Sequence, residues 1–290
     1  MTIPSSPVLY RGMGRAALDA AYDNSAAVKD SAAWLDAWRG RSAQIRQGRG
    51  VRLDIPYANG ERTKFDYLPA SPAKAPLFVF IHGGYWVRNS RDMFSFLAAG
   101  PNARGIDFVS VGYTLAPQAR LAQIEGEIRQ CLTHLSAQAD HLGFDREQIF
   151  VGGWSAGGHL AAITCDHPAV RGALPISGIF DLEPATLNYL NEPLQLTTDD
   201  IATLSPQRRL RAGLASQRLV VGGNELAELQ RQSRDYAAAA KAQNLDVTAR
   251  ILPGHHHFSI LDELAKPDGE ITNELAKLIA QTSEARQSTF

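Results

Sequence analysis

Short apolar runs recur along the chain, and helix-like stretches separate most of them. Six runs stand out after residue 76: LFVFI (77–81), DFVSVGY (107–113), IFVGG (149–153), GALPIS (172–177), RLVVGG (218–223) and VTARIL (247–252). Strands with continuous rather than alternating apolar residues are typical of a parallel sheet that helices cover on both faces. The pattern therefore predicts an α/β fold built on a mostly parallel central sheet.

The first part of the chain has a different pattern. Residues up to about 48 are rich in Ala, and four apolar residues of SAAWLDAWRGRSAQIRQ fall on one helical face: Trp34, Leu35, Trp38 and Ile45. VRLDIPY and RTKFDYLPA then alternate on either side of Asn59-Gly60, a dipeptide that tolerates the positive φ angles of a tight turn. We expect a helix that covers an apolar surface, followed by an antiparallel hairpin at an edge of the sheet.

The whole chain, 1–290, is expected to form a single α/β domain with a small helical cap. Residues 1–50 would contribute helices to this cap. The stretch 182–212 carries no strand signal and is too long for an ordinary connection, so it is predicted to be a helical insertion over the site. Ligands of open α/β sheets bind at the carboxyl ends of the strands, and functional motifs should fall there.

Positive and negative side chains almost balance, with 29 Lys and Arg against 30 Asp and Glu for a formal net charge of −1. Such a chain has no field that attracts nucleic acid or anionic lipid, so the expected partner is a small molecule. The N-terminus lacks the basic and apolar regions of a signal peptide, and no apolar run reaches the roughly 18 residues of a membrane span. We expect a soluble cytoplasmic protein and leave its oligomeric state open, a homodimer included.

The stretch IFVGGWSAGGHLAA places Ser155 directly after a predicted strand and directly before a predicted helix. The surrounding pattern G-x-S-x-G, from Gly153 to Gly157, fits a nucleophile elbow, a turn so sharp that the residues beside the serine must lack bulk. A glycine-rich turn with an incidental serine is the alternative. Because a hydroxyl is a poor nucleophile alone, the elbow hypothesis requires a base and an oxyanion hole elsewhere in the chain.

The motif His82-Gly83-Gly84-Tyr85-Trp86 ends the first parallel strand. Consecutive glycines let backbone N–H groups approach a substrate closely, and a turn that simply needs glycine is the alternative. Three residues of this motif are candidates for the oxyanion hole together with Ala156: Gly83, Gly84 and Tyr85. His82 precedes the nucleophile and belongs to the motif, so we expect it to organise this loop rather than to act as the base.

A base and an acid follow in the expected order. With a nucleophile elbow, the triad runs serine, acid, histidine along the chain. Glu225 follows the strand RLVVGG, and the run His255-His256-His257 follows the next strand. Neighbouring side chains in an extended stretch point to opposite faces, and no carboxylate or thiolate cluster accompanies the histidines, so they do not suit a metal ion. We expect one working imidazole and neither metal nor cofactor.

These residues resemble the α/β-hydrolase fold and, within it, the kynurenine formamidases (arylformamidases) near the esterases related to hormone-sensitive lipase. The resemblance covers most of the chain and rests on six motifs: HGGYW (82–86), GWSAGG (153–158), SGIFDL (177–182), LSP (204–206), NELAELQRQS (224–233) and HHHF (255–258). It implies that His257, followed by Phe258, is the base. It also places Glu225 where most relatives carry Asp, which leaves Asp181 as an alternative acid.

The resemblance implies a serine hydrolase with the triad Ser155, Glu225 and His257, which cleaves a small acyl ester or an aryl formamide through an acyl-enzyme. Three aromatic residues are candidates for the substrate pocket, although aromatic residues near an elbow are as often packing: Trp86, Trp154 and Phe258. Two alternatives to this hypothesis stay open. One is a formamidase specific for N-formylkynurenine, and the other is a non-catalytic member of the fold that binds a small ligand, which would usually have lost a triad residue.

Overall fold

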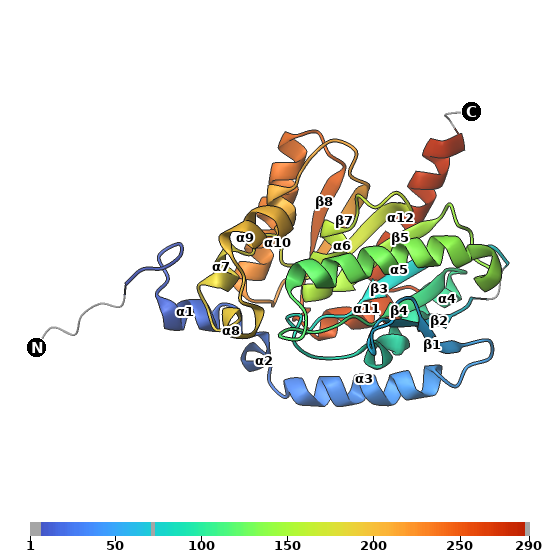
Figure 1. Ribbon diagram of the computed structural model, residues 1–290, viewed down its shortest axis with the longest axis horizontal. Coiled ribbons are helices and arrows are strands. Elements are labelled where there is room, and N and C mark those ends of the chain that lie inside the picture. Colours follow the sequence, from blue (N-terminus) through green and yellow to red (C-terminus); the bar gives the residue numbers. More distant parts are fainter. Residues whose placement is uncertain (1–6, 71–72, 288–290) are drawn as a thin grey trace, which may run out of the picture.

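Eight strands form one sheet in the order β1-β2-β4-β3-β5-β6-β7-β8 in the computed structural model, which describes residues 7–70 and 73–287 (Figure 1). β1 pairs antiparallel with β2, and β2 with β4, while all other neighbours are parallel. The bounds of the strands are β1 Arg52–Pro56, β2 Lys64–Leu68, β3 Leu77–Ile81, β4 Asp107–Val111, β5 Ile149–Trp154, β6 Val170–Ile176, β7 Ser216–Gly222 and β8 Val247–Leu252. The predicted mostly parallel sheet with an antiparallel edge is confirmed.

The turn of the edge hairpin differs from the prediction. Asn59 and Gly60 both keep negative φ angles, and the connection between β1 and β2 spans residues 57–63. Thr63 closes this loop by donating its hydroxyl to the carbonyl of Gly60 at 2.8 Å. The prediction of a tight turn was wrong because a threonine bond to the backbone stabilises a wider loop here.

Helices cover both faces of the sheet, as the continuous apolar residues of β3 require. Its residues alternate between two apolar clusters: Val79 belongs to the cluster that includes α5 and α6, whereas Phe80 belongs to the cluster that includes α3, η1, α11 and α12. The bounds of the long helices are α3 Ser31–Ile45, α5 Leu121–Leu142, α6 Ala156–Ile163, α10 Ala227–Ala242 and α12 Glu270–Gln287. The shorter elements are α1 Arg15–Ala20, α2 Asn24–Ala27, η1 Arg91–Ala98, α4 Ala99–Ala103, α7 Glu183–Thr186, α8 Asn191–Leu194, α9 Thr198–Leu204, η2 Pro206–Arg208, η3 Ser259–Leu261 and α11 Asp262–Ala265.

The N-terminal helix α3 covers an aromatic cluster, as its apolar face predicts. Trp38 is fully buried, and its ring meets the edge of Trp154 at 5.3 Å between centroids and lies 5.7 Å from Phe258. Trp34, Leu35 and Ile45 are partly buried against the same cluster. Because Trp154 directly precedes Ser155, α3 packs against the residue before the predicted nucleophile.

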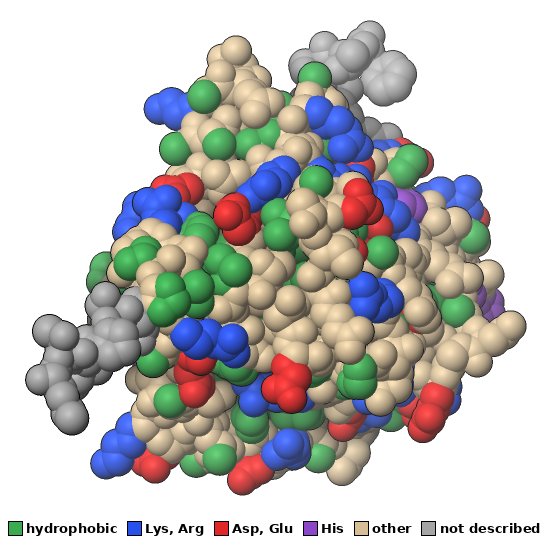
Figure 2. Space-filling model, turned by 60° about the vertical axis from the view of Figure 1, so that its left-hand side comes forward, with side chains coloured by type: hydrophobic (Ala, Val, Ile, Leu, Met, Phe, Trp, Pro, Cys, Tyr) green, Lys and Arg blue, Asp and Glu red, His purple; other side chains and the backbone are tan. Residues whose placement is uncertain are grey.

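The stretch 182–212 forms α7, α8, α9 and η2, beside α1 at one end of the molecule (Figure 1). Tyr189 connects the two segments, because its N–H donates to the Asp19 carboxylate at 2.9 Å. The surface in Figure 2 has basic and acidic side chains interspersed, in keeping with the net charge of −1. No helix within residues 7–70 and 73–287 has the length and apolarity needed to cross a bilayer.

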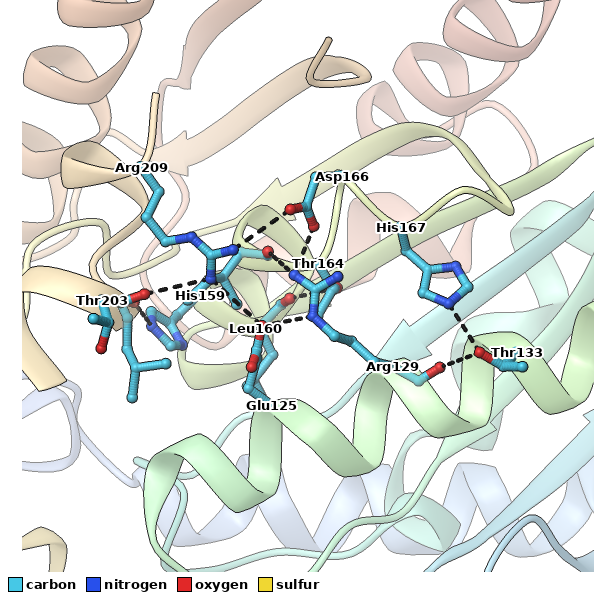
Figure 3. Close-up of polar contacts among 12 residues, drawn as sticks. Glu125, Arg129, Thr133, His159, Leu160, Thr164, Asp166, His167, Thr203 and Arg209 are labelled. Carbon is cyan, nitrogen blue, oxygen red and sulfur yellow. Dashed lines mark hydrogen bonds and ion pairs between the residues drawn. The ribbon is translucent and has the colours of Figure 1, made fainter. Parts of the chain in front are cut away.

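Asp166 links the end of the stretch 182–212 to helix α5 through ion pairs (Figure 3). Its carboxylate accepts from Arg129 of α5 at 2.6 Å, and also from Arg209 and Arg211 at the end of that stretch. Burial alone would raise the pKa of Asp166, but the hydrogen bonds and charges of the arginines outweigh it and bring the pKa below the ordinary value of 3.8. The charged form of Asp166 therefore stabilises the folded state.

Replacing Asp166 by Asn should lower the free energy of unfolding by about 1–3 kcal/mol at pH 7, because the charge-assisted bonds are lost. A carboxyl with a lowered folded pKa stabilises fully above its unfolded pKa, and this contribution disappears as the pH falls through the folded pKa. Urea unfolding from pH 7 downward should show the two proteins converging below about pH 3.8.

The matched control for this experiment is Asp140→Asn, because the side chain of Asp140 is 84% exposed and its ion pair with Arg146, at 3.4 Å, lies at the surface. Exposed pairs contribute little, so this variant should unfold like the wild type. A constant gap between Asp166→Asn and the wild type, down to the lowest pH at which both are folded, would contradict a role for the charge of Asp166.

Candidate active site

Ser155 lies in a sharp turn between β5 and α6. Its φ of 59° and ψ of −119° are values that residues with a Cβ atom rarely adopt. The N–H of Ser155 donates to the carbonyl of Ile176 on β6 at 2.8 Å, which fixes the turn against the neighbouring strand. Such strain persists only where the surroundings impose it, and it is found preferentially at functional positions. The backbone thus has the form that the nucleophile elbow predicts.

The two glycines of the motif are required by close backbone contacts. A Cβ atom on Gly157 would lie 1.9 Å from the carbonyl oxygen of Ile81, and one on Gly153 would lie 2.4 Å from the carbonyl oxygen of Gly157. Both obstructing atoms belong to the backbone and cannot rotate away. The glycines therefore let helix α6 start directly against the end of β3.

Glu225 and His257 form a buried pair beside the ends of β7 and β8. The Nδ1 atom of His257 lies 2.6 Å from Oε2 of Glu225, and the two side chains are 4% and 0% exposed. The other carboxylate oxygen, Oε1, accepts from the hydroxyl of Ser177 at 2.5 Å and from the N–H of Gly222 at 2.7 Å. Because Nδ1 donates to the carboxylate, Nε2 keeps a free lone pair, as a general base requires.

Asp181, the alternative acid, lies in a different environment. One of its carboxylate oxygens accepts from the N–H of Glu183 at 3.2 Å and from Arg208 at 3.3 Å. The structure thus pairs His257 with Glu225 and pairs Asp181 with an arginine.

The three adjacent histidines diverge. Nε2 of His255 lies 3.8 Å from the carboxylate of Glu263. Nδ1 of His256 accepts from the N–H of Ser259 at 3.2 Å, and its ring meets the edge of Trp34. Within the described residues, no group of three or more His, Cys, Asp or Glu side chains is placed to hold a metal ion. His257 is the member of the run that contacts Glu225.

Two side chains fix a peptide group in the loop after β3. The carbonyl of Gly83 accepts from the side-chain amide of Asn89 at 3.1 Å and lies 2.9 Å from Nδ1 of His82. Burial lowers the pKa of His82 to about 3, so its ring is neutral, and Nδ1 carries the proton that the carbonyl accepts. In a trans peptide the C=O and N–H groups point in opposite directions, so the N–H of Gly84 points away from these partners.

The other oxyanion candidates belong to the same region. Gly84, with φ 121°, and Tyr85, with φ 51°, have left-handed backbones, and a Cβ atom on Gly83 would lie 2.5 Å from the carbonyl oxygen of Trp154. Ala156 is the first residue of α6, where the N–H groups of a helix have no intrahelical acceptor. This arrangement suits a negatively charged oxygen beside Ser155.

A narrow cavity reaches Ser155. Its volume is about 20 Å³, roughly the room of a single ordered water. The residues around it come from the N-terminal segment, the loop after β3, the elbow and the loop after β8: Asn24, Ser25, Leu35, Gly84, Tyr85, Arg88, Asn89, Trp154, Ser155, His257 and Phe258. The serine and the histidine of the predicted triad therefore line the same cavity.

The three aromatic candidates for the pocket lie in different places. Trp154 and Phe258 line the cavity, and the indole N–H of Trp154 also donates to the carbonyl of His257 at 2.7 Å. Trp86 is fully buried and meets the edge of the His159 ring at 5.0 Å. Trp154 thus holds the backbone of His257 in addition to lining the cavity.

Sequence reasoning missed several residues of this site. Asn24, Ser25 and Leu35 line the cavity from helices far from every catalytic motif in the chain. Ser177 holds the carboxylate of Glu225. Its motif SGIFDL is part of the resemblance, but no local sequence pattern indicates that a serine after a strand will bind a particular carboxylate.

A family model described as the alpha/beta hydrolase fold matches residues 78–261 of the chain. This match runs from the second residue of β3 through β8 and includes all three members of the predicted triad. The chain belongs to the α/β-hydrolase fold family.

Two relatives indicate the group within the α/β-hydrolase fold family to which the chain is similar. The kynurenine formamidase of Danio rerio is 31% identical over 86% of this chain and 89% of its own length. That of Salmo salar is 31% identical over 79% of this chain and 82% of its own. The chain is therefore grouped with the kynurenine formamidases.

Solved structures share the fold. The crystal structure of a candidate thioesterase from Silicibacter sp. TM1040 has a TM-score of 0.81 and 30% sequence identity, and the alignment covers 88% of this chain and 97% of that chain. A Pyrobaculum calidifontis esterase aligns over 88% of this chain and 95% of its own, with a TM-score of 0.71 at 19% identity.

Proposed function

We propose that this protein is a serine hydrolase that cleaves aryl formamides and small acyl esters, with Ser155 as nucleophile, His257 as general base and Glu225 as the acid of the triad. The observation that carries the proposal is that the strained Ser155 and His257, whose Nδ1 is held by Glu225, line the same cavity. The names of the relatives, kynurenine formamidases from two fishes, support the formamide part.

In the proposed reaction, Nε2 of His257 takes the proton of Ser155 while the serine oxygen attacks the carbonyl carbon. The N–H groups of Gly84 and Ala156, with Tyr85 beside them, stabilise the oxyanion. His257 then gives the proton to the leaving amine or alcohol, and a formyl- or acyl-enzyme remains. Water, activated by the same imidazole, releases formate or the short-chain acid and restores Ser155.

The size of the cavity favours the smallest acyl groups. Because the cavity has room for about one water, a bound substrate must displace side chains that line it, and a formyl group, which carries only hydrogen on its carbonyl carbon, requires the least displacement on the acyl side. Leu35 and Phe258 line this space, and each added methylene of a longer acyl chain would have to displace such a side chain. We therefore place formyl and acetyl groups ahead of longer acyl groups.

A side-by-side assay tests the proposal. The purified protein is given N-formylkynurenine and the 4-nitrophenyl esters of formate, acetate and butyrate, with a chelator present throughout. We expect turnover of the formamide and of the short esters, with kcat/KM falling from formate to butyrate. Absence of turnover on all four substrates, or activity that the chelator abolishes, would refute the proposed function.

A further inference from the structure

Asn24 presents a buried oxygen at the cavity of Ser155. The residue is 3% exposed and lines this cavity, and its Oδ1 atom has no hydrogen-bond partner within the described part of the chain. Buried acceptors are usually paired, so an unpaired one at a cavity indicates a partner from outside the protein, either a water or a donor group of a ligand. The question is whether this oxygen, rather than the amide nitrogen, is the free atom.

The hydrogen bonds around Tyr85 show which atom of the Asn24 amide is left without a partner. Its hydroxyl donates its single hydrogen to the carbonyl of Tyr22, so it can only accept from Asn24, whose Nδ2 lies 2.6 Å away. Burial raises the pKa of Tyr85 well above its usual value of 10, so this hydrogen stays in place. The amide of Asn24 is thus oriented with its nitrogen on Tyr85, and Oδ1 is left as an acceptor.

An acceptor of this kind can assist the cleavage of an amide, whereas it cannot assist the cleavage of an ester. Attack by Ser155 makes the substrate nitrogen pyramidal, and its lone pair must face His257 to receive the proton. The N–H bond of that nitrogen then points toward another part of the cavity wall. An ester has an oxygen at this position and no hydrogen to donate, so an acceptor there acts on amides alone.

We propose that Oδ1 of Asn24 accepts a hydrogen bond from the scissile N–H of a formamide substrate and thereby sets the preference of the site for amides over esters. This inference rests on the proposed serine hydrolase function. Because the bond strengthens as the nitrogen becomes pyramidal, it contributes mainly to kcat. The N-terminal segment would then supply a specificity-determining residue as well as a cover.

The test compares two substrates that differ only in the leaving atom, 4-nitroformanilide and 4-nitrophenyl formate. Asn24→Ala should lower kcat/KM on the formanilide roughly tenfold, as the loss of one hydrogen bond predicts, and should leave the ester within about twofold. Retained ester turnover also shows that the variant is folded. The matched control is Asn102→Ala, because Asn102 also has an Oδ1 atom without a partner among the described residues but does not line the cavity. This variant should change neither substrate by more than about twofold.

Each other outcome overturns the inference. Equal losses on both substrates would mean that Asn24 only holds Tyr85 in place, and a second variant, Tyr85→Phe, would then reproduce those losses. No change on the formanilide would mean that Oδ1 does not meet the substrate. Failure of the wild type on both substrates would instead refute the proposed function itself, whereas ester turnover without formanilide turnover would refute only the role of Asn24.

Discussion

Replacing Ser155 by alanine should lower kcat by about 10⁴- to 10⁶-fold, because the acyl-enzyme can no longer form. A fluorophosphonate probe should label the wild type at Ser155 and should not label the variant. Alanine removes only the oxygen of a buried side chain, so the fold should persist, which circular dichroism and thermal unfolding would verify. Labelling of another serine in the wild type would disprove the assignment.

His257→Ala should cost about as much as Ser155→Ala, and the double variant should be little worse than either, because the two residues act as a unit. The neighbouring histidines provide matched controls. His256 packs on Trp34, and His255 faces Glu263, so alanine at either position should cost far less. Equal losses at all three histidines would favour a metal site over a serine nucleophile.

Glu225→Gln should lower kcat by roughly 10³- to 10⁴-fold, the scale of a triad acid, and the contacts of the carboxylate explain why. Gly222 presents an N–H to Oε1, so the oxygen of a glutamine would remain on that side. The amide nitrogen would then face Nδ1 of His257, which would have to become an acceptor. The proton of the imidazole would move to Nε2, and the base would lose the lone pair that Ser155 needs.

Two comparisons make the Glu225 experiment decisive. Glu225→Asp should retain more activity than Glu225→Gln, since the charge survives and only the reach shortens. Asp181→Asn should stay near wild-type activity, because Asp181 pairs with Arg208. Steady-state kinetics on 4-nitrophenyl acetate measures all three variants. If Asp181→Asn lost the activity and Glu225→Gln kept it, the acid would be Asp181.

The parts of the site that the sequence predicted are those with a local cause. The strand before Ser155 is a continuous apolar run, and the two glycines of the elbow are required because a Cβ atom at either position would meet backbone atoms, so the pattern indicates the turn. The same holds for the loop of His82, whose glycines permit left-handed and closely packed backbone. Steric requirements of this kind are visible in any short window of the chain.

The hairpin at the sheet edge shows where a local pattern was insufficient. Asn59-Gly60 favours a tight turn, yet Thr63 and Tyr57 close a wider loop through bonds to the backbone. The strands were predicted because their alternation reflects burial of one face. The turn was not, because several loops of similar energy can join the same two strands.

By itself, the sequence determined the fold, the elbow and the order of serine, acid and histidine, since apolar runs and glycine positions express burial and steric limits directly. Only the tertiary structure brought Glu225 rather than Asp181 to His257, and only it closed the cavity with Asn24 from the N-terminal segment. These contacts join residues far apart in the chain. Their formation depends on how helices and loops pack over the sheet. A short stretch of sequence does not determine how far its residues lie from residues of a distant stretch.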